Sequence, residues 1–255
     1  MLVAEMAARM TGVLYTYQTH FLYVGALIAS SRHQHHAGQV MWVPCGLEIE
    51  DEDGAQRQVT GHVVRPDTPH AHGAASAAAV LWVDRDDLQW DDASSSLPGR
   101  VRALPATTGA RLGGLLAPNE ARDVARALLE VVAPAEGVRT RAARHPAVMR
   151  MCALLDTTAP ERDIRMTQLA QQSGLSLRQL RHRFTEELGI NPRSYLRWRR
   201  LRRAVTAIER GATLTEAAVT GGFADGAHFS RVFQAQFGMA PSQALSSVHF
   251  GGPLA

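Results

Sequence analysis

The chain has little cysteine, no lysine and no long apolar run, and the first and the last of these features each exclude a class of protein. Two cysteines among 255 residues are too few for a disulfide framework or for a zinc site built from cysteine alone. No run of about 18 apolar residues is present, so we expect no membrane-spanning helix. The N-terminus also lacks the pattern of a signal peptide. With 45% hydrophobic and 20% charged residues, the composition predicts an ordinary folded protein, and the scarcity of cysteine fits the reducing environment of the cytoplasm.

All 27 basic residues are arginine, and they are distributed unevenly along the chain. Residues 1–138 carry 10 arginines and 16 acidic residues, whereas residues 139–255 carry 17 arginines and 8 acidic residues. A GC-rich coding sequence explains the missing lysine, but it does not explain this division of charge. A basic half joined to an acidic half predicts a polyanion-binding domain attached to a domain with another task.

The acidic half shows the pattern of short strands. Turn signals such as the acidic Asp51–Gly54, the proline-containing 66–69 and the loop-like 94–99 separate segments of apolar or alternating character. These segments are 39–43, 47–50, 58–64 and 77–83. Strands at this spacing predict a small barrel or sandwich.

A helix is expected at about 118–133, at the end of the acidic half. Its apolar stripe consists of Val124, Leu128, Leu129 and Val132. Such a stripe fits two roles equally well: packing on the helix's own barrel, or contact with another domain or a second copy of the chain. We place the domain boundary just after it, at about 138–145.

Residues 166–184 have the pattern of a helix, a tight turn and a second helix. Ala170 is small where two helices would cross, and Gly174 suits a left-handed turn four residues later. Ser176 is a suitable N-cap for the second helix. Leu177, Leu180 and Phe184 are expected to face inward, which leaves Arg178, Arg181, His182 and Arg183 outside. An arginine-lined helix after a glycine turn is typical of a helix that enters the DNA major groove.

The same pattern returns 48 residues later, at 214–233. Ala218 and Gly222 repeat the spacing of the first unit, and Asp225 is the expected cap of the second outer helix. Phe229, Val232 and Phe233 are expected inside, with His228, Ser230 and Arg231 outside. A helix that starts at Asn191–Pro192 and runs to about Glu209–Gly211 would join the two helix-turn-helix units as a rod.

The basic half resembles the DNA-binding domain of the AraC/XylS family of transcriptional regulators. The resemblance covers about residues 146–245 and is carried by Gly222–Phe223, His228–Phe233 and Phe237–Pro241, with Arg200, Leu201 and Ala204 in the linker. It implies an α+β protein with an N-terminal cupin-like β-barrel, followed by an all-α domain of two helix-turn-helix units. We assign 1–138 to the sensing domain and 139–255 to the DNA-binding domain.

The resemblance also implies which residues contact DNA. Base-reading positions fall on Arg178, Arg181 and His182 in the first unit, beside Arg183. In the second unit they fall on Gly226, Ala227, His228, Ser230 and Arg231. Because Gly226 and Ala227 replace polar residues, we expect the first unit to carry most of the specificity. The linker arginines Arg193, Arg197, Arg199, Arg202 and Arg203 are expected to contact phosphates or to form a solvated face.

Histidines are concentrated in two segments of the acidic half, 33–36 and 70–72. In the resemblance to cupins, His33, His35 and His70 take the places of metal-binding histidines, and Gln39 replaces the acidic ligand. Imidazoles from two strands can bind a divalent metal. The alternative is that these side chains line an effector pocket or lie on the surface.

These features favour a non-enzymatic, sequence-specific transcription regulator controlled by a small molecule or a metal in the barrel. Double-stranded DNA is the expected partner, RNA polymerase and a second copy of the chain are further partners, and no membrane is involved. A cupin-type metalloenzyme fused to a DNA-binding domain is the alternative function. A constitutive DNA-architectural protein would leave the barrel without a task.

Overall fold

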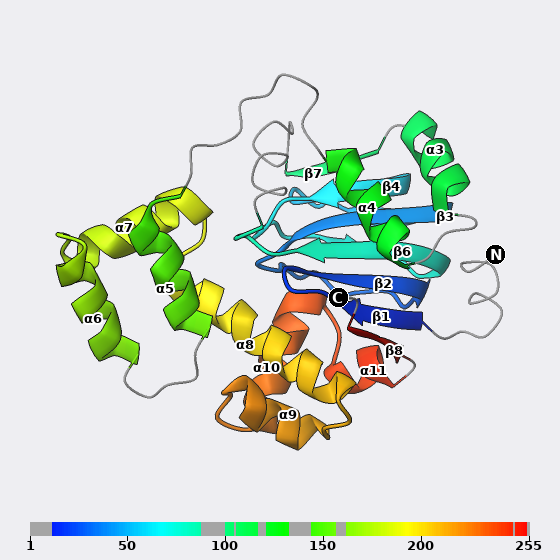
Figure 1. The fold of residues 1–255 in the computed structure, drawn as a ribbon. Coiled ribbons are helices and arrows are strands. Elements are labelled where there is room, and N and C mark those ends of the chain that lie inside the picture. The colour runs from blue at the N-terminus through cyan, green and yellow to red at the C-terminus, as the bar shows by residue number, and fades with distance from the viewer. Residues whose placement is uncertain are drawn as a thin grey trace. The chain divides into compact units, whose positions relative to one another are not determined.

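The computed structural model describes residues 12–87, 100–104, 106–116, 121–132, 144–156, 162–246 and 248–253. The chain forms two compact units (Figure 1). The first contains residues 1–138 together with 233–255, and the second contains residues 139–232. The predicted loop at 94–99 and the residues 133–143 around the predicted domain boundary lie outside the described part of the chain.

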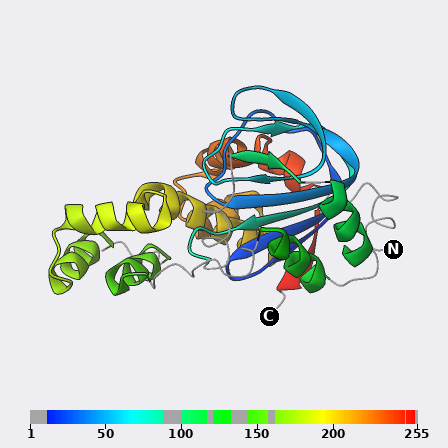
Figure 2. The same cartoon turned by 90° about the horizontal axis from the view of Figure 1, so that it is seen from above.

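The first unit is built on a mixed sheet with the strand order β7-β4-β3-β6-β2-β1-β8, and β5 pairs with β3. The strands are β1 (Gly12–Thr16), β2 (His20–Leu27), β3 (Gly38–Glu50), β4 (Gln56–Val64), β5 (Ala71–His72), β6 (Ala75–Val83), β7 (Val101–Ala103) and β8 (Val248–Pro253). Neighbouring strands are antiparallel except β1 and β8, which are parallel. The sheet curls over one of its faces (Figure 2), and we call it the barrel.

The two predicted segments at 39–43 and 47–50 form the single long strand β3. Its pairing register with β4 shifts between Trp42 and Leu47, where Gly46 has a φ of 74°. Such a bulge bends a strand and lets it follow the curl of the barrel. The predicted acidic turn follows at the end of β3, where the Asp51 carboxylate accepts hydrogen bonds from the backbone N–H groups of Asp53 (3.1 Å) and Ala55 (2.9 Å).

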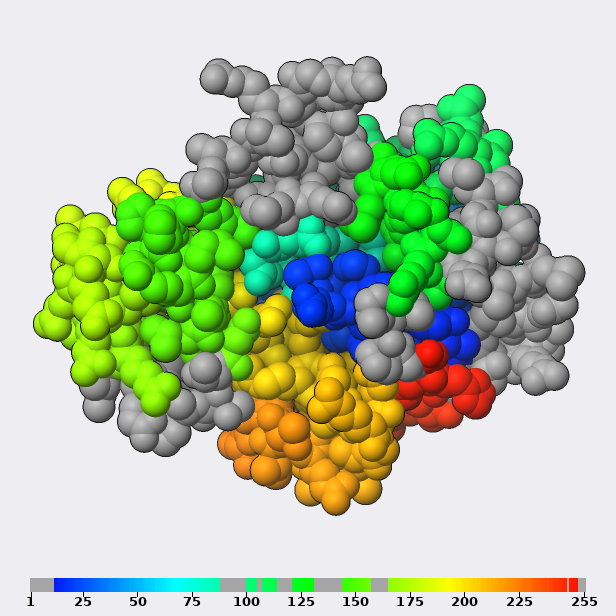
Figure 3. All heavy atoms as spheres, in the orientation of Figure 1, coloured from blue at the N-terminus to red at the C-terminus, as the bar shows by residue number. Residues whose placement is uncertain are grey.

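Alternation along β3 divides its side chains between the two faces of the barrel. Val40 and Trp42 belong to one buried cluster, and Met41 and Val43 belong to another. The first cluster also contains side chains of helix α4 (Ala121–Val132), which covers that face beside α3 (Ala106–Leu116) (Figures 1 and 3). The opposite face is the barrel interior.

Helix α4 resolves the alternatives that the sequence leaves open for the segment at 118–133. Val124 and Leu128 are fully buried in the same cluster as Val40 and Leu81 of the barrel. The apolar stripe therefore packs on the helix's own barrel. At α3, for which the sequence analysis predicts no helix, the Trp42 indole N–H donates a hydrogen bond to the carbonyl of Gly109 (3.1 Å).

The remaining helices continue from the second unit into the C-terminal part of the first. They are α5 (Pro146–Asp156), α6 (Arg162–Gln172), α7 (Leu177–Leu188), α8 (Pro192–Glu209), α9 (Leu214–Gly221), α10 (Gly226–Phe237) and α11 (Pro241–Leu245). The predicted α+β architecture, a barrel followed by helix-turn-helix units, is confirmed. Within the described residues, no helix is both long and apolar enough to cross a membrane.

Three of the five linker arginines serve the fold instead of forming a solvated face. The Arg199 guanidinium donates two hydrogen bonds to the Asp156 carboxylate (2.5 and 2.9 Å), which ties α8 to the end of α5. Arg203 donates to the Asp156 carbonyl (2.9 Å), and Arg202 is buried. The prediction that Arg202 contacts phosphate is therefore wrong, because the helix turns this side chain inward.

We expect Asp156→Ala to destabilise the helical unit by about 1–2 kcal/mol. The substitution removes a bidentate, charge-assisted contact that is only partly exposed to solvent and leaves the Arg199 guanidinium without that carboxylate. Native-state hydrogen exchange of the α8 amides measures the stability of the helical unit separately from that of the barrel. The protection of these amides should fall by about 5–30-fold.

Asp123→Ala is the matched control, because Asp123 pairs with Arg126 on the exposed surface of α4. An exposed ion pair contributes about 0–1 kcal/mol, so exchange of the α4 amides, measured in the same way, should change little in this variant. Equal effects of the two substitutions would show that Asp156 does not tie α5 to α8.

Candidate functional site

The first helix-turn-helix unit consists of α6, a tight turn and α7. Gly174 has a φ of 67°, as the turn requires, and Ala170 is buried where the two helices approach. Ser176 caps α7 in a capping box with Gln179: the Gln179 N–H donates to Ser176 Oγ (3.2 Å), and the Ser176 N–H donates to Gln179 Oε1 (2.8 Å). The cap fixes where the second helix begins, and thus which side chains it presents.

The second helix-turn-helix unit repeats this construction with α9 and α10. Gly222 has a φ of 80°, and the Asp225 carboxylate caps the start of α10 by accepting a hydrogen bond from the His228 N–H (2.6 Å). A Cβ atom at Gly221 would lie 2.8 Å from the Arg200 carbonyl, so α9 packs closely on α8. The 18 residues of α8 make a rod of about 27 Å between the units, comparable with the roughly 34 Å of one DNA turn.

The predicted DNA-contacting residues differ in how freely they face solvent. In α7, Arg178, Arg181, His182 and Arg183 are all exposed, and Leu180 and Phe184 are buried behind them. In α10, Arg231 is exposed, but Ser230 and His228 are half-buried. The His228 ring packs edge-on against Phe223 at 5.3 Å, so it contributes to the turn of its own unit.

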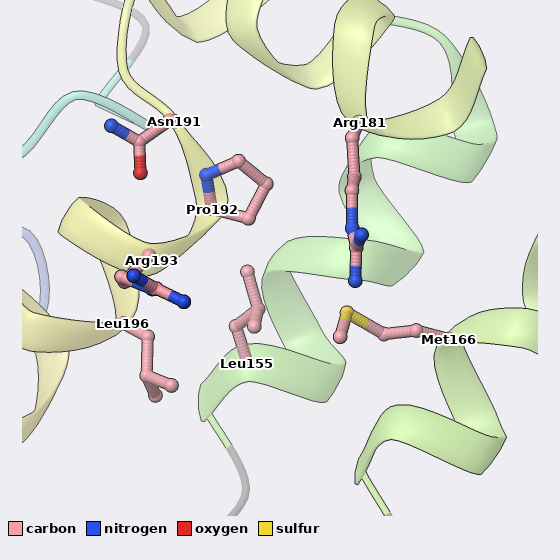
Figure 4. Close-up of a pocket in the computed structure, with 7 residues that line it drawn as sticks. All are labelled: Leu155, Met166, Arg181, Asn191, Pro192, Arg193 and Leu196. Atoms are coloured by element: carbon pink, nitrogen blue, oxygen red, sulfur yellow. The ribbon is translucent and has the colours of Figure 1, made fainter. Parts of the chain in front are cut away.

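Arg181 also lines a cavity of about 500 Å³ in the helical unit (Figure 4). Its side chain extends from α7 toward Met166, and Arg193 enters from the first turn of α8. The other lining residues are Leu155, Asn191, Pro192 and Leu196. Arg181 therefore lies at the flank of the recognition helix, with its stem against apolar side chains.

The histidines of the two predicted segments come together in the barrel. The backbones of His33 and His70 pair with each other, and each N–H donates to the carbonyl of the other at 2.9 Å. His33, His35 and His70 are all buried, and one nitrogen of each ring lies within 4.8 Å of the other two. Within the described residues, this is the group of histidine, cysteine and acidic side chains that is close enough to hold a metal ion.

The backbone fixes the tautomer of these three rings. In each, Nδ1 lies beside a carbonyl oxygen: Ser31 for His33 (2.9 Å), Ala37 for His35 (2.7 Å) and Thr68 for His70 (2.9 Å). A carbonyl only accepts hydrogen bonds, so each Nδ1 carries the proton and donates it. Each Nε2 therefore keeps its lone pair, which is the form in which histidine binds a metal.

Gln39, the fourth predicted ligand, is also buried, with its Oε1 atom 3.3 Å from Nε2 of His35. Both atoms accept hydrogen bonds in the tautomer that the backbone sets. Their approach is favourable when the amide is turned to present its N–H₂ group, or when a cation lies between the two lone pairs. The structure thus brings all four predicted residues to one place.

Two further histidines are buried in this barrel: His62, which the sequence does not single out, and His72, which ends the predicted segment 70–72 but is not among the four predicted ligands. His62 lies opposite Met41 in the β3–β4 pairing, is fully buried, and has no hydrogen-bond partner at either ring nitrogen. His72 is buried beside them, with Nδ1 3.0 Å from the Gly73 carbonyl. A histidine within an otherwise apolar run, as in the Val59–Val64 segment, is the signal that could have revealed His62.

Burial keeps these imidazoles neutral. Desolvation, with the nearby His35, lowers the pKa of His33 to about 3, and desolvation lowers the pKa of His35 to about 4. The pKa of His70 also lies well below its usual range, for the same reason. At neutral pH the cluster therefore offers uncharged nitrogen donors.

Comparisons with known proteins agree with this geometry. A family model described as a helix-turn-helix domain matches residues 169–247. The transcriptional activator RhaS of Escherichia coli is 35% identical over 74 residues, which are 29% of this chain and 27% of RhaS. The matched segment thus spans about a quarter of that relative's length.

Solved structures of ToxT from Vibrio cholerae share the fold over most of the chain. One, with a bound unsaturated fatty acid, covers 90% of this chain and 96% of its own, with a TM-score of 0.54 and 12% identity. Another, from strain O395, covers 90% and 98% with a TM-score of 0.55 and 13% identity. At this identity the likeness concerns the fold.

The helical part of the chain is therefore a helix-turn-helix domain with two units. More particularly, residues 169–247 form a domain of the AraC type, and the resemblance to AraC/XylS regulators noted from Gly222–Phe223, His228–Phe233 and Phe237–Pro241 is confirmed.

We expect the burial of His62 to make the barrel sensitive to acid. Burial, with the nearby His72 and His35, lowers the pKa of His62 from 6.5 to about 3. The unfolded chain therefore binds a proton below pH 6.5 that the folded chain does not, so the free energy of unfolding falls with pH until about pH 3. Between pH 7 and pH 5 this loss is about 2 kcal/mol for one such imidazole.

The variant His62→Leu isolates this contribution, because it keeps the position apolar and removes the titrating group. Chemical denaturation at pH 7 and pH 5 should show about 2 kcal/mol less acid destabilisation in the variant than in the natural chain. The same pH dependence in both proteins would contradict the assignment.

Proposed function

We propose that the protein is a sequence-specific DNA-binding transcription regulator whose affinity for DNA is set by a ligand in the barrel. The observation that carries this proposal is the pair of helix-turn-helix units on one linker helix, with the exposed arginines of α7 on the first of them. The duplicated construction, with capped second helices and glycine turns, suits two successive major-groove faces.

The two classes of DNA contact are assigned by position. Arg178, Arg181 and Arg183, with His182, lie on α7 and would read base edges, where arginine recognises guanine through two hydrogen bonds. Arg231 is the exposed cation of α10, beside the half-buried His228 and Ser230. Arg193 and Arg197 are exposed on α8 and suit phosphates, which position the domain without reading sequence.

The barrel is the regulatory part. The unsaturated fatty acid named for one ToxT structure supports a ligand-responsive role for this fold, although the buried histidines indicate a more polar ligand here. RNA polymerase is the partner expected of a regulator at a promoter, and a homodimer would place two such domains on DNA. A cupin-type metalloenzyme is disfavoured, because Gln39 stands where the acidic ligand of the cupin pattern belongs and because catalysis would not require the tandem units.

DNA binding by the full chain tests the proposal. Selection of duplexes from a random pool should yield a preferred sequence. The affinity for it should fall steeply as salt rises, because arginine–phosphate contacts release counterions. Failure to select any sequence, or an affinity indifferent to salt, would contradict a sequence-specific regulator.

On the selected site, we expect Arg181→Ala and Arg197→Ala to weaken binding in different ways. Arg181→Ala should cost about 1–3 kcal/mol at one base pair and relax the preference there. Arg197→Ala should weaken binding to all sequences alike and reduce the salt dependence by about one counterion. Titration of matched and single-substituted duplexes distinguishes the two, and the reverse pattern would overturn the assignment of α7 and α8.

A further inference from the structure

We propose that His33, His35 and His70 bind a divalent late first-row transition metal, and that the loop carrying two of these ligands transmits the bound state to the end of α10. The ligand of the regulator proposed above would then be a metal ion. Its effect on DNA rests on that function, but metal binding does not.

The first support is the arrangement of the three rings. A metal about 2.0–2.1 Å from each Nε2 atom would hold the ring centroids about 4.5–5.2 Å apart. The observed separations are 4.3 Å for His33 and His70, 4.9 Å for His35 and His70, and 5.8 Å for His33 and His35. Small side-chain rotations therefore suffice to bring all three nitrogens onto one ion.

The second support is an unpartnered nitrogen inside the cluster. His70 is fully buried, its Nδ1 is committed to the Thr68 carbonyl, and its Nε2 has no hydrogen-bond partner. A buried polar atom without a partner costs roughly 1–3 kcal/mol, so such atoms commonly mark an ion or a ligand. Coordination would satisfy this nitrogen and would also separate the facing acceptors of His35 and Gln39.

The donor set selects the class of metal. The three ligands are neutral nitrogen atoms, and Gln39 can add only a neutral amide oxygen. Asp67, the nearby acidic residue, is already paired with His36 and with Arg85 (3.0 Å). Imidazole donors suit Co²⁺, Ni²⁺, Cu²⁺ and Zn²⁺, whereas Mg²⁺ and Ca²⁺ require oxygen and negative charge.

The ligand loop also contacts the residues that end α10. We call residues 31–36 the histidine loop. The Ser31 N–H and hydroxyl both donate to the Gly238 carbonyl (3.0 and 2.7 Å). The His36 N–H donates to Oε1 of Gln236 (2.9 Å), and the Gln34 N–H lies 3.4 Å from the Ala235 carbonyl.

This contact is close enough to transmit a displacement. A Cβ atom added at Gly238 would lie 2.8 Å from Nδ1 of His33. Residue 238 therefore has no room for a side chain between His33 and the end of α10. Gln236 is buried, and Phe237 packs edge-on against Trp82 of the barrel at 5.7 Å. A metal that holds His33 and His35 together restricts the histidine loop, and the loop shares its hydrogen bonds with α10. The two binding events are therefore coupled through a common element.

Metal binding is tested first on the full chain without DNA. Titration with Zn²⁺ should give one site per chain, and Co²⁺ should give the visible absorption of a nitrogen-ligated ion, whereas Mg²⁺ should not bind. His70→Gln should weaken Zn²⁺ binding at least tenfold. His62→Gln is the matched control, an equally buried histidine of the same barrel outside the triad, and should retain it. Absence of Zn²⁺ and Co²⁺ binding, or equal losses in the two variants, would overturn the site.

The variant His70→Gln could lose Zn²⁺ binding through misfolding, so a second variant, Gln39→Glu, is tested. This variant is expected to bind Zn²⁺ more tightly than the natural chain does. The carboxylate would lie beside Nε2 of His35 and add the negative charge that the site lacks. The metal-free variant should melt at a lower temperature than the natural chain, and Zn²⁺ should raise its melting temperature by more. A variant that is destabilised and not rescued by Zn²⁺, Ni²⁺ or Co²⁺ would overturn the metal site.

Transmission is tested by DNA affinity with and without Zn²⁺. We expect Zn²⁺ to change the affinity of the natural chain at least fivefold, and DNA to change the affinity for Zn²⁺ by the same factor. Gln236→Ala should bind both ligands but lose most of this coupling. The control Gln234→Ala, an exposed position on the same helix, should keep it.

The outcomes separate the two proposals. Sequence-specific DNA binding that Zn²⁺ leaves unchanged, in a protein that binds Zn²⁺, overturns the transmission and leaves the regulator in place. Zn²⁺ binding without any DNA binding overturns the proposed function and leaves the metal site. Coupling that survives Gln236→Ala would overturn transmission through the hydrogen bond between His36 and Gln236.

Discussion

The contact on which the rest of the molecule depends is the return of the chain's end to the barrel. β8 pairs in parallel with β1, so an edge of the sheet is completed by residues that follow both helix-turn-helix units. An uncovered edge strand would present unpaired backbone groups, and parallel pairing requires a long connection. The helices lie within that connection. A fragment that ends at residue 138 would therefore lack part of its own sheet, and the last turn of α10 belongs to the same compact unit as the histidine loop.

The unit that contains the barrel has a second constraint: it buries several imidazoles that must stay uncharged. In His33, His35 and His70 the Nδ1 atom is satisfied by a carbonyl of its own segment, which costs the fold little and orients the ring. Nε2 of His70 and both ring nitrogens of His62 receive no such compensation, and a core built for stability alone would favour apolar residues at these two positions. A buried group that lowers the free energy of unfolding of the ligand-free barrel is tolerable when a ligand binds there. A ligand that binds only the folded state raises this free energy again by mass action.

The parts that could be predicted from sequence are those in which local chemistry determines structure. Gly174 and Gly222 mark left-handed turns, Ser176 and Asp225 cap helices, and their 48-residue repeat reveals the tandem units before any packing is known. The strands β1 and β2 could not be predicted, because the residues between them, 17–19, include no glycine, proline, asparagine or aspartate that would mark a turn. β8 escaped because its partner lies more than 200 residues away. The resemblance to cupins grouped His33, His35 and His70, and the structure places these three side chains close together. His62 could not be found in this way, because strand register brings it into the barrel, and Arg202 is turned inward by tertiary packing.

The two helix-turn-helix units are unequal, and the inequality suits a regulator. α7 carries four exposed basic side chains and belongs wholly to the helical unit, so its capacity to read bases does not depend on the barrel. α10 begins with Gly226 and Ala227, which have no side chain that reaches a base edge, and its last turn is hydrogen-bonded to the histidine loop. A ligand in the barrel would therefore change how the second helix-turn-helix unit binds DNA. It would leave the base preference of the first helix-turn-helix unit unchanged. Specificity and control are then carried by different helices, so the ligand can change the strength of binding without changing the sequence that is bound.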